Sequence, residues 1–159
     1  MRKRIVKEES APASRAGELD VEALATVVVS SEAPGSPVEN AFDGRRGPGA
    51  TRWVAGESGV QTLTLEFDAP QLVRQVLLEV EEREVGRTQD VVLSISVDGG
   101  KSFRELLRQE FNFSPPATSF EREEWTLHSE PLSHLRLRIL PDKGGGDYGR
   151  ASITTLALK

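Results

Sequence analysis

The strongest constraint on the fold of this chain is a two-residue alternation of apolar and polar side chains. The stretches TLTLEF, VVLSISV and LRLRIL all alternate in this way, and LVRQVLLEVE keeps Val76, Leu78 and Val80 in phase. A period of two is typical of strands with one buried and one wet face, as in antiparallel sheets. In VVLSISV the alternation predicts that Val97 continues the buried face and that Ser96 lies on the wet one.

Turn-forming segments separate these strands. Gly, Pro, Asp and Asn gather in DAPQ, DGGK, NFSPPAT and PDKGGGDYG. About eight strands at this spacing are typical of a sandwich or barrel, and the helical candidates ELDVEAL and PVENAFDG are short. We therefore expect an all-β fold, an antiparallel β-sandwich over residues 21–159. A flexible charged tail, residues 1–20, precedes it.

Charge and composition narrow the functional classes. The chain has 159 residues, a net charge of −5 and no cysteine, which disfavours direct nucleic-acid contact and excludes a disulfide framework. It offers no stretch of about 20 apolar residues for a membrane span, and Lys7, Glu8 and Glu9 interrupt any secretory h-region. We expect a cytoplasmic protein. No Gly-x-Ser-x-Gly motif occurs, and His128 and His134 are interpreted as ordinary polar residues, so an enzyme is not expected.

The hairpin SVDGGKSF has a pattern of its own. Ser96, Asp98, Gly100, Ser102 and Phe103 resemble the Asp-box of β-propeller hydrolases and other β-folds. That resemblance implies a structural role in which the Asp98 carboxylate accepts the amides of its own turn.

The order of the elements resembles a known family. VVVSSEAPGSPVENAFDG, then TRW, GVQTLTLEFDAPQLVRQVLLEV, VVLSISVDGGKSF and a closing RASITTLAL are similar to the discoidin, or coagulation factor type C, domain of the galactose-binding-like superfamily. The resemblance covers residues 25–158. It implies a jelly-roll sandwich and a non-catalytic binding module whose loops at one end hold carbohydrate, lipid headgroup or protein.

The same resemblance implies a structural calcium ion in the loop AFDGRRGPGATRW, with Asp43 and Thr51 as side-chain ligands. Calcium favours six to eight oxygen ligands and tolerates irregular loops. The family's glutamate in the last strand is replaced here by Thr155, and arginines crowd the loop. The alternative is that Asp43 caps its turn and pairs with Arg52. Trp53 is expected in the core.

Two loops correspond to the family's ligand-binding positions. EEREVGRTQD supplies Arg83 and Arg87, and KGGGDYGR supplies Tyr148 with Arg150 beside it. The resemblance implies that these residues meet a saccharide in one pocket. The alternative for both arginines is surface pairing with the acidic residues around them, in a run whose alternation favours a solvated strand face.

The loop FNFSPPATSF supports a second function. Phe120 covers the end of the sandwich or contacts a ligand, and at least one of Phe111 and Phe113 belongs to the core. Carbohydrate recognition is the first hypothesis. The alternative is an intracellular protein-interaction domain that uses Phe113, Phe120 and the SPPAT loop.

Overall fold

The computed structural model describes residues 1–3, 17–145 and 149–159. Within these ranges most of the regular structure is strand. The elements are α1 (Val21–Leu24), β1 (Ala25–Val29), the 3₁₀ helix η2 (Val38–Phe42), β2 (Trp53–Val54), β3 (Gln61–Gln71), β4 (Gln75–Glu81), β5 (Arg87–Ser96), β6 (Arg104–Phe113), β7 (Phe120–Thr126), β8 (Leu132–Leu140), β9 (Ser152–Ile153) and β10 (Thr155–Leu158).

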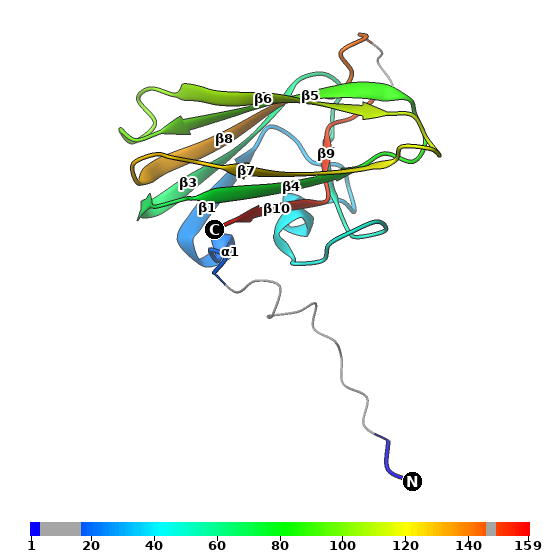
Figure 1. Ribbon diagram of the computed structural model, residues 1–159, viewed down its shortest axis with the longest axis horizontal. Coiled ribbons are helices and arrows are strands. Elements are labelled where there is room, and N and C mark those ends of the chain that lie inside the picture. Colours follow the sequence, from blue (N-terminus) through cyan, green and yellow to red (C-terminus); the bar gives the residue numbers. More distant parts are fainter. Residues whose placement is uncertain (4–16, 146–148) are drawn as a thin grey trace.

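Three antiparallel sheets form the sandwich. One sheet has the order β1-β3-β8-β5-β6, a second has β10-β4-β7, and a short third pairs β2 with β9. Figure 1 shows the long strands running along the long axis of the molecule. The loops after β4, β6 and β8 share one end, and the hairpin after β5 and the loop after β7 share the other. This arrangement confirms the antiparallel β-sandwich predicted from the periodicity.

The core lies between the two larger sheets. The five-stranded sheet contributes one face of β3, β8 and β5, and the three-stranded sheet contributes Val76, Leu78 and Val80 of β4. Burying each such side chain contributes about 1.5–3 kcal/mol. Trp53 is fully buried, and its indole Nε1 donates to the Ser31 carbonyl at 3.0 Å. The expected core position of Trp53 is confirmed.

The alternation fails at the end of β5. Val97, predicted to be buried, is 51% exposed because β5 ends at Ser96. Ser96, predicted to be wet, is buried because the following hairpin folds back on it, and the Gly100 amide donates to its Oγ at 3.0 Å. The period of a strand therefore does not predict burial at its last residue, where the hairpin that follows can cover the outer face.

The N-terminal side of the domain begins with a short helix. The Asp20 side chain accepts from the Ala23 amide at 3.3 Å and so caps α1, as N-cap aspartates do. The Leu19 amide donates to the Leu158 carbonyl at 2.8 Å, which places this segment beside the last strand. Figure 1 shows α1 next to the C-terminus. No helix in the described ranges is long and apolar enough to cross a membrane.

Candidate functional site

The glycine-rich loop between η2 and β2 rests on the outer face of β4. Its support consists of two carboxylates, Glu79 and Glu81, which are only 1% and 2% exposed. The Gly47 amide donates to Glu79 Oε2 at 3.0 Å, and the Gly49 amide donates to Glu81 Oε2 at 3.0 Å. Both glycines have φ above +80°, where a side chain would be strained. Glycine thus allows the loop to aim its amides at the two buried charges.

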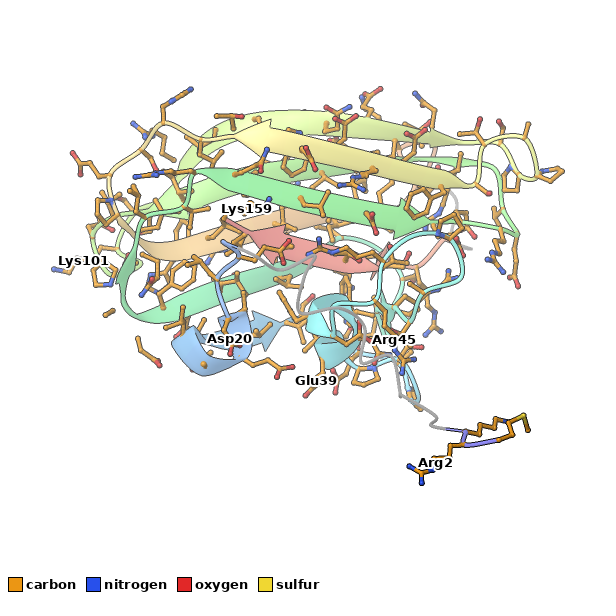
Figure 2. All side chains as sticks on the ribbon, turned by 60° about the horizontal axis from the view of Figure 1, so that its bottom comes forward. Arg2, Asp20, Glu39, Arg45, Lys101 and Lys159 are labelled. Atoms are coloured by element: carbon orange, nitrogen blue, oxygen red, sulfur yellow. The ribbon has the colours of Figure 1, made fainter. Side chains whose placement is uncertain are left out.

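Two arginines complete the neutralisation of Glu81. Arg52 Nη2 lies 3.2 Å and Arg83 Nε 2.7 Å from Glu81 Oε1. Arg52 Nη1 also donates to the Glu81 carbonyl at 3.1 Å. A buried carboxylate is stable only when its oxygens are paired in this way. We refer to Glu79, Glu81 and the loop residues 43–52 as the carboxylate-supported loop; Figure 2 shows Arg45 of this loop beside η2.

Buried carboxylates on β4 correct the sequence interpretation. The acidic run was predicted to be a solvated strand face, but Glu79 and Glu81 lie under the loop. These two residues were missed because the groups that cover them are 32 positions earlier in the chain. The available signal was an acidic pair in an otherwise apolar strand, together with a distant loop rich in glycine and arginine.

Asp43 and Thr51, the calcium ligands implied by the resemblance, do lie together. The Thr51 hydroxyl donates to one Asp43 oxygen, and the Arg45 amide donates to the other at 2.9 Å. The Thr155 hydroxyl donates to the Arg45 carbonyl at 3.1 Å. In the described part of the chain, no three acidic, histidine or cysteine side chains are grouped to hold a metal ion. With one carboxylate whose oxygens already accept protein donors, this donor set fits calcium poorly.

The alternative partner proposed for Asp43 is wrong. Arg52 forms its ion pair with Glu81, not with Asp43. Asp43 does occupy the C-cap position of η2, and its carboxylate accepts the amide two residues on. Asp43 therefore caps its turn as predicted, but the ion pair of Arg52 is made with Glu81 of β4.

Arg87 is the most buried of the predicted ligand residues that the structure describes. Its side chain is 2% exposed, and its Nε lies 2.8 Å from Glu82 Oε1. Its Nη1 donates to Gln89 Oε1 at 3.1 Å and to the Pro141 carbonyl at 2.7 Å. The backbone of Gly149 passes so close that an added Cβ would lie 3.1 Å from Arg87 Cδ. Arg87 thus joins the loop after β4 to the loop after β8.

Arg83 belongs to a different network. Its side chain is 57% exposed and pairs with Glu81 on the outer face of β4, whereas Arg87 is enclosed beside Gln89. The structure therefore does not bring the two guanidinium groups together in one pocket. Ion pairing with neighbouring glutamates, the alternative interpretation of both arginines, is present in each case.

The remaining predicted ligand residues are spread over the loop end. Arg150 is exposed, and its Nη1 donates to the Gly56 carbonyl at 2.8 Å. Phe120 is half-buried as the first residue of β7, paired with Glu81. Tyr148 lies outside the described residues. Whether Arg83, Tyr148, Arg150 or Phe120 contacts a ligand stays a prediction.

The apolar surface predicted for binding a protein partner is smaller than the sequence indicated. Phe113 is buried, as is Phe111, and the two ring centroids are 6.4 Å apart. Both residues point into the sandwich because they occupy the inward positions of β6. Phe113 therefore offers no surface to a partner, and only the half-buried Phe120 remains of the predicted aromatic pair.

The hairpin after β5 has the contacts expected of an Asp-box. Asp98 Oδ1 accepts the Ser102 amide at 3.0 Å and the Ser96 hydroxyl at 2.7 Å, and Asp98 Oδ2 accepts the Ser102 hydroxyl at 2.5 Å. These hydrogen bonds, that of the Ser102 hydroxyl foremost, hold the pKa of Asp98 well below its ordinary value of 3.8. The structural role predicted for Asp98 is confirmed.

Comparison with known proteins gives a family and a set of structural neighbours. Curated protein sequences gave no significant match. A Clostridium perfringens NanJ family 32 carbohydrate-binding module, in complex with galactose, matches with a TM-score of 0.64 and 16% identity over 89% of this chain and 96% of that one. The CBM32 of AlyQ, in complex with 4,5-unsaturated mannuronic acid, matches with a TM-score of 0.61 and 22% identity over 86% of this chain and 95% of that one.

A third neighbour comes from the same organism as the first. CpGH89CBM32-5 from Clostridium perfringens, in complex with GalNAc-β-1,3-galactose, gives a TM-score of 0.63 and 22% identity over 89% of this chain and 98% of that one. At these identities the likeness establishes the fold. The family model of the F5/8 type C domain matches residues 26–156, which is most of the sandwich. The chain therefore belongs to the F5/8 type C domain family.

Proposed function

We propose that this domain is a non-catalytic module that binds carbohydrate through the loops at the end of the sandwich formed after β4, β6 and β8. The observation that carries the proposal is the family match over residues 26–156. Support comes from neighbours of the same fold that were solved with galactose, GalNAc-β-1,3-galactose and an unsaturated mannuronic acid.

The exposed guanidinium groups are the proposed contacts. Arg83 and Arg150 are both exposed. Arg83 pairs with Glu81, and Arg150 donates to the carbonyls of Ala55 and Gly56, so the motion of each side chain is limited. A guanidinium presents several donors in a fixed plane and so suits the paired hydroxyls of a sugar ring. Tyr148, from the sequence pattern, is the proposed aromatic partner for the apolar face of the ring.

Arg87 is assigned a positioning role at the same end. Because its side chain is enclosed and its Nε and Nη1 donate to Glu82, Gln89 and Pro141, it fixes the loops and does not touch the sugar. This differs from the direct contact that the resemblance implies. Arg83 and Arg87 are therefore expected to behave differently when each is replaced.

A glycan-array screen of the purified domain, followed by calorimetric titration with the best ligand, tests the proposal. Arg83→Ala and Tyr148→Ala should abolish or strongly weaken binding without lowering the melting temperature appreciably. Arg138→Ala is the matched control, because Arg138 is an exposed arginine on the outer face of β8 and not in a loop. No binding on the array, or binding that survives both variants, would overturn the proposal and direct the search to protein partners.

A further inference from the structure

A hollow of about 760 Å³ lies at the end of the sandwich opposite the proposed loop site. It is bounded by the end of β5, the start of β6 and the loop between β7 and β8. Figure 1 shows these segments together at one end, and Figure 2 marks that end with Lys101 of the β5–β6 hairpin. Its size is that of a small-ligand pocket.

One side of the hollow is apolar. Ile95, Val97 and Phe103 line it, and Val97 is the exposed apolar residue that the strand alternation placed in the core. The Phe103 ring is fixed, because the Arg136 guanidinium lies 3.7 Å from its centroid and the His134 ring meets it in a T-shaped contact. Phe103 is half-buried and lines the hollow, so part of the fixed ring is within reach of a ligand there. A held aromatic face beside an aliphatic group suits the C–H face of a sugar.

The other side of the hollow is lined by polar side chains. Arg104, His128 and Glu130 line it and are exposed. Among the described residues, none of these three side chains has a hydrogen-bond or ion-pair partner, whereas Arg108 on the same strand pairs with Asp90. Guanidinium supplies donors, carboxylate supplies acceptors and imidazole can do either. A hydroxyl group needs both kinds of partner, and the opposite charges of Arg104 and Glu130 favour a neutral ligand over an anion.

We propose that this hollow is a second binding site, for a neutral saccharide ring that stacks on Phe103 and hydrogen-bonds to Arg104, His128 and Glu130. The ligand class rests on the proposed function, but the residues are entirely different. The two sites lie at opposite ends of the long strands, so they would bind separate sugar chains. The domain would then link two glycans and not only attach to one.

The test is a titration of ¹⁵N-labelled domain with galactose and, separately, N-acetylgalactosamine, followed by amide chemical shifts. Two sets of perturbed amides are expected, one at residues 82–86 and 141–150 and one at 95–104 and 128–130. His128→Ala and Glu130→Gln should each raise the dissociation constant measured from the second set of amides at least about tenfold, a factor that corresponds to 1.4 kcal/mol. Both variants should leave the dissociation constant measured from the first set unchanged. Arg138→Ala, the control, should change neither constant.

The titration distinguishes failure of the second site from failure of the first. Shifts confined to residues 82–86 and 141–150 would overturn the second site and leave the proposed function standing. Shifts confined to 95–104 and 128–130, lost in His128→Ala, would support the second site against the first. No shifts with either sugar would overturn the second site. Because His128 and Glu130 are exposed, their replacement should not affect folding, and unchanged melting temperatures confirm this.

Discussion

At the scale of single residues, Arg87 shows how a buried charge organises the loop end. Its guanidinium joins Glu82, Gln89 and the Pro141 carbonyl, and its side chain is almost wholly enclosed. A charge in that position costs free energy unless each donor finds an acceptor. The side chain is therefore structural, even though its sequence position matches a ligand-binding loop.

Replacing the two arginines separates these roles. Arg87→Ala should lower the free energy of unfolding by about 3 kcal/mol, because it leaves Glu82 and the buried Gln89 without their partner. Arg83→Ala should cost under about 1 kcal/mol, because it removes an exposed member of an ion pair that Arg52 also serves. Urea denaturation measures both values. Equal losses would contradict the assignment.

The hairpin residue Asp98 predicts a pH dependence. Its folded-state pKa is depressed, so the carboxylate stabilises the fold at pH values above its ordinary pKa of 3.8. That contribution is lost as the pH falls from about 4 toward the lowered value. Asp98→Asn should therefore be less stable than the parent at neutral pH, and the difference in melting temperature should shrink below pH 4. A difference that is the same at all pH values would contradict the account.

At the scale of elements, β4 shows what sequence can and cannot predict. Its inner face, Val76, Leu78 and Val80, follows the alternation because the opposite sheet buries every second residue. Its outer face does not, because burial there comes from a loop distant in sequence that places glycine amides on Glu79 and Glu81. The alternation within a strand predicts which face the opposite sheet buries, but not whether a distant loop covers the other face. For the same reason, Arg83 and Arg87 were assigned one pocket although they enter separate networks.

We infer that the carboxylate-supported loop is held by protein groups without calcium. Glu81→Gln should lower the free energy of unfolding by about 3 kcal/mol, because Arg52 and Arg83 lose a buried anionic partner. Glu84→Gln is the control, since Glu84 is exposed.

Thermal unfolding of the parent should be the same with calcium chloride and with EDTA. Stabilisation by calcium that Asp43→Asn abolishes would revive the metal site.

At the scale of the whole molecule, the fold follows from the alternation, while the edges of the domain depend on tertiary contacts. Residues 18–20, which the sequence placed in the charged tail, contact the sandwich. Arg46 Nη2 lies 2.5 Å from Glu18 Oε1, and both side chains are largely buried. A charge count groups Glu18 and Asp20 with the tail because it does not register a partner nearly 30 residues later. The cytoplasmic location stays a prediction.

The folded unit is therefore expected to begin before Val21. A chain that starts at Val21 should be less stable than one that starts at Gly17 by at least about 2 kcal/mol, because it loses the α1 cap and the partner of Arg46. It also loses the Leu19–Leu158 hydrogen bond beside β10. Urea denaturation of the two chains measures the difference, and Glu18→Gln in the longer chain isolates the ion pair. Equal stability would show that the sandwich needs none of residues 18–20 and would return the boundary to residue 21.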